Sequence, residues 1–214
     1  TLDRSSAASD VYKRQPIARL IATGLTPIVN NTLIKIGDII QSSTDANPLI
    51  MGIVLGGIIT VVGTAPLSSM ALTALLGLTG APMAIGAMAA FSSAFMNSTL
   101  FHRLKLGDRK STISVGIEPL SQADIVSANP IPIYVTNFFG GAIAGIIIAW
   151  SGMINNATGT ATPIAGFLVM FGFNSLTKVI IYGVVMAIIG TIAGFVGSIV
   201  FKKYPITVSY THLR

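Results

Sequence analysis

The residue best suited to chemistry in this 214-residue chain is Glu118, which lies between Gly116 and Pro119 within a segment of mixed polarity, residues 111–130. The segment is too polar to face lipid along its whole length and too apolar for a solvated loop. Irregular backbone at membrane depth is tolerated where it is buried in protein or lines a cavity. We therefore predict a re-entrant hairpin with Glu118 at its turn, where a carboxylate is by default a substrate or ion site. The alternative is that Glu118 faces water beside the basic residues that precede it.

Histidine and amide side chains supply the other candidate ligands. His102 can donate or accept a hydrogen bond near neutral pH, although an interfacial histidine at a helix end is an equally good interpretation. Asn97, Gln122 and Asn129 are neutral amides, which can orient a bound polar ligand. Amides also hold membrane helices together, at about 0.6 kcal/mol per hydrogen bond. For each amide taken singly, packing is the expected role.

No arrangement for soluble catalysis is present in the sequence. The chain has no cysteine, which excludes disulfides, thiolate metal sites and cysteine nucleophiles. We find no Ser-His-Asp arrangement, no metal-ligand spacing and no glycine loop of the phosphate-binding type. The sequence therefore predicts no catalytic residue, no metal and no cofactor.

The composition indicates which elements must position these residues. The chain is 52% hydrophobic and only 9% charged, whereas soluble domains are about 25% charged. Too few charges are present to cover a soluble surface. The sequence therefore predicts an all-α integral membrane protein, a bundle of several transmembrane helices.

Apolar stretches of about 20 residues are long enough to span a membrane. Residues 48–67, 131–150 and 176–201 each form such a stretch. Residues 70–100 exceed one span and are interrupted near Pro82, which favours a half-helix followed by a full span. Two shorter apolar stretches, at residues 17–29 and 163–173, are predicted to form partial membrane helices.

Three small-residue motifs predict close contact between helices. They are Gly52-x-x-x-Gly56, Gly141-x-x-x-Gly145 and Gly190-x-x-x-Gly194. Such motifs let two helix backbones approach each other closely. The contacts are expected either within one chain or at the seam of a homodimer.

Basic residues predict the orientation in the membrane. Several occur within residues 103–110, and two more follow at Lys202 and Lys203. Cytoplasmic loops of membrane proteins carry an excess of Lys and Arg. Both places are therefore predicted to be cytoplasmic in a multi-pass protein of the bacterial plasma (inner) membrane. The polar, uncharged residues 151–162 suit the outer side. Charges flanked by spans are a topology signal, so nucleic acid is not expected as a partner.

The two ends differ from the chain between them. Residues 1–15 (TLDRSSAASDVYKRQ) and 207–214 (TVSYTHLR) share neither its composition nor its periodicity, and they resemble translated sequencing-adapter read-through. We expect both to be non-native, with a partial transmembrane domain at residues 16–206. A native disordered tail is the alternative.

The segment Val115-Gly-Ile-Glu-Pro119 resembles the Gly-Ile-Thr-Glu-Pro signature of enzyme IIC, the sugar permease subunit of the bacterial phosphotransferase system. The stretches at residues 65–73, 95–99 and 117–125 are similar to a stand-alone IIC-like branch described as toxin regulators. One difference matters. The Thr before the glutamate is missing here, so its hydroxyl has no counterpart.

This resemblance implies a function and its partners. In the family, the motif glutamate and a nearby histidine hold sugar hydroxyls, which implies those roles for Glu118 and His102. The implied function is translocation of a sugar that a separate IIB protein phosphorylates, with IIA and IIB as cytoplasmic partners and the lipid bilayer as solvent. At most, the chain would be the membrane subunit of a sugar phosphotransferase. Two alternatives stay open: a membrane sensor or regulator without transport, and an ion-coupled secondary transporter.

Overall fold

The computed structural model describes residues 47–207 without a gap, together with residues 23–24, 27, 31–32, 34–40 and 42. The chain forms two units, Thr1–Asp38 and Ile39–Arg214. In the first unit the described residues are helical and mostly exposed. The leader predicted at residues 1–15 lies outside the described residues, as do most of the apolar segment at 17–29 and the tail beyond Thr207.

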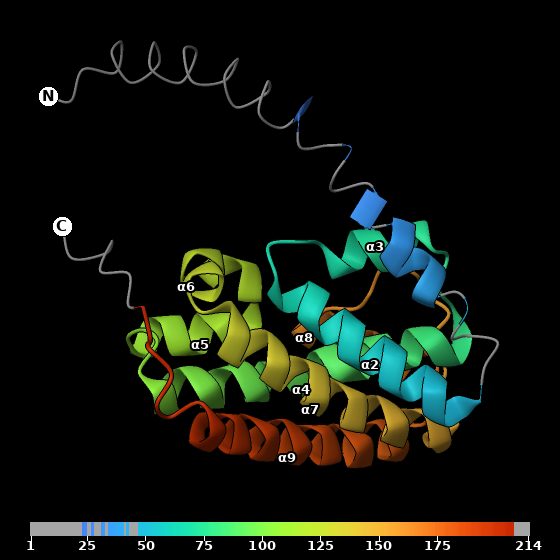
Figure 1. Cartoon of the computed structure of the whole chain (residues 1–214). Helices are drawn as coiled ribbons and strands as arrows, with labels where there is room; N and C mark the ends of the chain where they lie inside the picture. Colours follow the sequence, from blue (N-terminus) through green and yellow to red (C-terminus); the bar gives the residue numbers. More distant parts are fainter. Residues whose placement is uncertain are drawn as a thin grey trace, which may run out of the picture. The chain divides into compact units, whose positions relative to one another are not determined.

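The second unit is a helical bundle, as the composition predicts (Figure 1). Within the described residues, α4, α7 and α9 are long and apolar enough to cross a membrane. The elements in chain order are α2 (Pro48–Thr64), α3 (Ser69–Leu75), α4 (Gly80–Leu104), α5 (Arg109–Ile117), η1 (Pro119–Gln122), α6 (Ala123–Ala128), α7 (Pro130–Ser151), α8 (Pro163–Val169), η2 (Met170–Gly172) and α9 (Leu176–Val200).

The apolar stretch at residues 70–100 is divided in two, which confirms the predicted half-helix followed by a full span. The short α3 ends at Leu75, and the long α4 begins at Gly80. Gly77 and Gly80 have φ angles of 60° and 65°. Glycine adopts this left-handed region without the steric penalty of a Cβ atom, so the chain can reverse between the two helices.

The helix α2 is shorter than the stretch predicted at residues 48–67. It ends at Thr64 because Ala65 precedes Pro66, and a residue before proline is disfavoured in the α conformation. Ala65 is accordingly extended, with φ −66° and ψ 161°. With 17 residues, α2 is at the lower limit for a membrane span.

Two of the predicted glycine motifs pack against each other inside this chain, between α2 and α7. A Cβ atom added at Gly56 would overlap the carbonyl oxygen of Gly141, and one added at Gly145 would overlap the carbonyl oxygen of Gly52. The helix backbones are therefore in direct contact. Thr60 reinforces this contact, because its Oγ1 donates a hydrogen bond of 2.8 Å to the carbonyl oxygen of Asn137.

The third motif joins α9 to α4. Cβ atoms at Gly190 and Gly194 would overlap the carbonyl oxygens of Ser92 and Met96. Ser92 also donates from Oγ to the carbonyl oxygen of Met186 at 2.9 Å. Because α4 also packs on α2, α7, α5 and α8, it is the central helix of the bundle.

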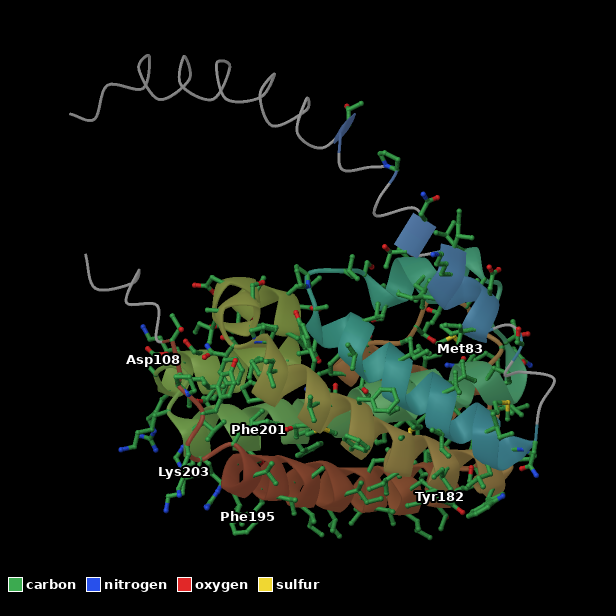
Figure 2. All side chains as sticks on the ribbon, in the orientation of Figure 1. Met83, Asp108, Tyr182, Phe195, Phe201 and Lys203 are labelled. Atoms are coloured by element: carbon green, nitrogen blue, oxygen red, sulfur yellow. The ribbon has the colours of Figure 1, made fainter. Side chains whose placement is uncertain are left out.

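The basic residues of two distant segments meet at one end of the bundle. Arg103, near the end of α4, donates from Nε to Ser198 Oγ at 2.7 Å, and its guanidinium lies 4.1 Å from the centre of the Phe195 ring. Figure 2 shows Asp108 and Lys203 at this end and Tyr182 toward the other. The loop at residues 103–110 and the Lys202–Lys203 pair therefore share one side, as their predicted common orientation requires.

Glycine at the α2–α7 contact should be essential for stability. We expect Gly56→Ala to lower the free energy of unfolding by about 1–3 kcal/mol, because the added methyl group forces two backbones apart. Gly172→Ala is the matched control, since a Cβ atom there meets nothing within 4 Å, and it should change stability by no more than about 0.5 kcal/mol. Unfolding in detergent measures both. Equal losses in the two variants would contradict the proposed contact.

Candidate functional site

The segment that carries Glu118 consists of α5, η1 and α6, between α4 and α7. Asp108 begins it by capping α5, where its Oδ1 accepts a hydrogen bond of 2.8 Å from the Ser111 amide. This bond lowers the pKa of Asp108 below its ordinary value, because it stabilises the charged carboxylate. α5 ends at Ile117, and Glu118 is extended because Pro119 follows it.

The helix α5 runs back along α4. A Cβ atom added at Gly116 would overlap Ser98 Oγ and would lie 3.3 Å from the carbonyl oxygen of Ala94. Ser98 and Ala94 precede the end of α4 by six and ten residues, which corresponds to roughly 9–15 Å along the helix. The glycine therefore allows the turn at Glu118 to lie beside the middle part of α4 and away from its end.

A single apolar cluster fixes this segment on the bundle. Its members come from α4, the following loop, α5, α6 and α7, and all are buried: Leu100, Phe101, Leu106, Val115, Ile125, Val126 and Ile133. Val115 faces this cluster from α5, and Ile125 and Val126 face it from α6. The two helices on either side of the turn are therefore held by the same core.

Glu118 itself is exposed at the turn. Its backbone carbonyl accepts hydrogen bonds from the Ser121 amide at 3.0 Å and from Ser121 Oγ at 2.7 Å. Its carboxylate accepts only a long bond of 3.4 Å from the Leu120 amide among the described residues. The backbone of Glu118 is thus fixed, while its carboxylate keeps most of its hydrogen-bonding capacity.

Gln122 lies one turn after Glu118 and shares a neighbour with it. Its Nε2 donates to the carbonyl oxygen of Ser121 at 2.8 Å. Asp124, in the first turn of α6, is exposed. η1, which contains Gln122, also lies against α2, so the turn brings this amide and the neighbouring Glu118 toward α2.

His102 is exposed in the last turn of α4. No hydrogen bond or ion pair links it to Glu118 in the part of the chain that the structure describes. The next residue, Arg103, reaches toward α9. The structure thus places the two predicted sugar ligands on different elements without joining them.

Asn97 lies in a fully buried polar cluster where α2, α4 and α7 meet. Its Oδ1 accepts from Asn137 Nδ2 at 2.6 Å, and its Nδ2 donates to Thr64 Oγ1 at 3.3 Å. Thr64 in turn donates to the carbonyl oxygen of Thr60 at 2.8 Å. The sequence analysis did not single out Asn137, Thr60 or Thr64, although an Asn inside a span was a usable signal for Asn137.

Asn129 is also buried, at the junction of α6 and α7. Its amide pairs with the backbone of Thr207, donating to the carbonyl oxygen at 2.8 Å and accepting from the amide at 2.9 Å. Nδ2 also donates to the carbonyl oxygen of Ile125 at 2.9 Å. Asn129 therefore fastens the segment that follows α9 to the start of α7.

Comparison with known proteins gives one match. The model of a family described as "Phosphotransferase system, EIIC" matches residues 14–211, which include every candidate site residue. No curated protein and no solved structure matches the chain significantly.

The role of Asn97 can be separated from a purely structural one by comparing it with Asn137. Alanine at either position leaves buried partners unpaired, and we expect each change to cost about 1–3 kcal/mol of stability. If Asn97 also contacts a sugar, Asn97→Ala should weaken sugar binding more than Asn137→Ala does at a temperature where both are folded. Unfolding curves and binding isotherms measure the two effects. Unchanged stability in both variants would contradict the polar cluster.

Proposed function

The chain belongs to the EIIC family of the phosphotransferase system, and from this premise we propose that it binds a sugar at the Glu118 turn and carries it across the membrane. Membership gives the chain a permease-like membrane role in that system, with a sugar as substrate and a IIB protein as partner. The placement of Glu118 carries the more specific proposal.

Three features of the turn support Glu118 as the sugar ligand. The carboxylate is exposed and has one long hydrogen bond among the described residues, so its oxygens can accept from sugar hydroxyls. Gly116 lets the turn lie beside the middle part of α4. If α4 spans the membrane, the turn lies at the depth of the hydrocarbon layer, where its exposed residues must face a water-filled cavity or protein.

The other candidate ligands differ in how easily they could contact a sugar. Gln122 is one turn from Glu118 and has only local hydrogen bonds, so it can turn toward a ligand at small cost. Asn97 and Asn129 are already bonded and buried, and a sugar would have to replace those partners. For His102, contact with the same sugar would require movement between α4 and the turn.

Phosphorylation needs a donor outside this chain. The chain has no cysteine, and nothing in it resembles a phosphoryl carrier. In the proposed step a sugar hydroxyl oxygen forms a bond to phosphorus while the bond between phosphorus and the carrier breaks. Glu118 would orient that hydroxyl and accept its proton.

The alternative function is a regulator that binds sugar without transporting it, and one feature of the turn favours it. The turn lacks the threonine that precedes the glutamate in the family signature. A regulator would keep sugar binding and yield no phosphorylated sugar with IIA and IIB proteins. An ion-coupled transporter would couple movement of its substrate to an ion gradient and would not need IIB.

We also propose that the basic end of the bundle is cytoplasmic in a bacterial plasma membrane. The chain has no native cysteine, so single cysteines report topology without background. In inside-out vesicles we expect Lys105→Cys to react with an impermeant maleimide and Thr158→Cys to be protected. In right-side-out vesicles the pattern should reverse. The same pattern in both vesicle types would contradict the orientation.

The sugar site is tested by removing one negative charge. We expect the wild-type chain in nanodiscs to bind a hexose or disaccharide saturably, and Glu118→Gln to weaken that binding by roughly 10- to 100-fold. The expected size follows from the loss of charge-assisted hydrogen bonds. Isothermal titration over a panel of sugars measures this effect.

Asp124→Asn is the matched control, because it removes an exposed carboxylate of the same segment on the other side of the turn. It should leave sugar affinity unchanged. Equal effects of the two substitutions, or binding that is indifferent to Glu118, would reject the site. Binding that depends on Glu118 without phosphorylation in the presence of IIA and IIB would favour the regulator.

A further inference from the structure

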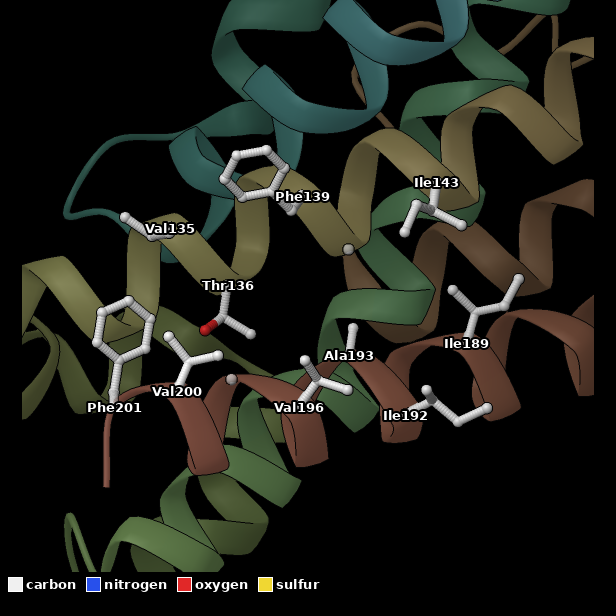
Figure 3. Close-up of a pocket in the computed structure, with 12 residues that line it drawn as sticks. Val135, Thr136, Phe139, Ile143, Ile189, Ile192, Ala193, Val196, Val200 and Phe201 are labelled. Atoms are coloured by element: carbon white, nitrogen blue, oxygen red, sulfur yellow. The ribbon is translucent and has the colours of Figure 1, made fainter. Parts of the chain in front are cut away.

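An apolar groove runs along the outside of the bundle between α7 and α9 (Figure 3). Its floor consists of small residues, including Gly140, Ala193 and Gly197. The walls are Val135, Phe139 and Ile143 from α7, and Ile192, Val196 and Val200 from α9. The groove holds about 470 Å³, a volume within the range of small-ligand sites.

The groove presents almost no polar group to an occupant. Its one hydroxyl belongs to Thr136, and Oγ1 of this residue already donates to the carbonyl oxygen of Pro132 at 2.6 Å. Gly197 lies against the Thr136 side chain, which narrows the floor there. An occupant of this groove must therefore be apolar along its length.

The length of the groove matches one leaflet of a bilayer. Its lining residues run from Ile189 on α9 to Phe201, the residue that follows this helix, which corresponds to about 18 Å at the rise of an α-helix. Half of the hydrocarbon thickness of a bilayer is about 15 Å. A spanning helix of a second protein would need about twice this length, whereas an acyl chain of one leaflet fits within it.

One end of the groove is positively charged. Phe201 lines that end, and Lys202 and Lys203 follow directly and are exposed. No ion pair engages either lysine within the described residues. A phosphate group at the membrane surface would therefore meet two cations at the mouth of an apolar groove.

We propose that this groove binds one acyl chain of an anionic phospholipid whose phosphate group lies against Lys202 and Lys203. The two parts of the site require both an apolar tail and a negative head in one molecule. This inference is independent of the sugar site, because none of the groove residues belongs to the Glu118 turn.

The headgroup contact is tested with spin-labelled lipids in phosphatidylcholine nanodiscs that contain the full chain. We expect spin-labelled phosphatidylglycerol to associate more strongly than spin-labelled phosphatidylcholine, as measured by the fraction of motionally restricted label. The double variant Lys202→Gln/Lys203→Gln should lower this preference by roughly fivefold for each lysine. The double variant Lys105→Gln/Lys110→Gln is the control, since these exposed lysines lie off the groove, and it should keep the preference.

The tail contact is tested on α9 with a matched pair of exposed isoleucines. Ile192→Trp should fill the groove and reduce the restricted fraction, whereas Ile188→Trp, on the same helix but outside the groove, should not. No preference for phosphatidylglycerol, or equal effects in test and control variants, would overturn the proposal. Disulfide-linked dimers of a Val196→Cys variant would also overturn it, because a second copy would then occupy the groove.

Discussion

The direct contact between the backbones of α2 and α7 is the constraint on which the rest of the bundle depends. It exists because Gly56 and Gly141 have no side chains to separate the two helices. This approach brings Thr60 within 2.8 Å of the carbonyl oxygen of Asn137. Asn137 in turn donates a hydrogen bond to Asn97 on α4. The absence of side chains at two glycines therefore permits a polar cluster that joins three helices.

Burial in an apolar bundle makes unpaired polar groups costly, and the described side chains reflect this. Among the described residues, no buried side-chain nitrogen or oxygen lacks a hydrogen-bond partner. The amide oxygen and the amide nitrogen of both Asn97 and Asn129 have hydrogen-bond partners. The Glu118 carboxylate differs because its backbone is fixed by Ser121 while the charged oxygens have one long bond. This difference in hydrogen bonding distinguishes the two asparagines, which stabilise the fold, from the Glu118 carboxylate, which can still accept further hydrogen bonds.

The two proposed sites use different surfaces of the same bundle. The Glu118 turn is positioned by α4 through Gly116, whereas the lipid groove lies between α7 and α9. The helix α4 packs on both α7 and α9. The central helix therefore provides a common support, although the chemistry of one site is polar and that of the other is apolar.

The sequence by itself determined the membrane-helical class, the break near Pro82 in the apolar stretch at residues 70–100 and the glycine motifs, because hydropathy and backbone sterics are local properties. It also singled out Glu118 as a carboxylate near Gly and Pro. Only the tertiary structure decided that the glycine motifs act inside this chain and that Asn97 and Asn129 bond to Asn137 and Thr207. The physical reason is that a hydrogen-bond partner up to 78 residues away depends on which helices pack together, and residue spacing along the chain does not determine that packing.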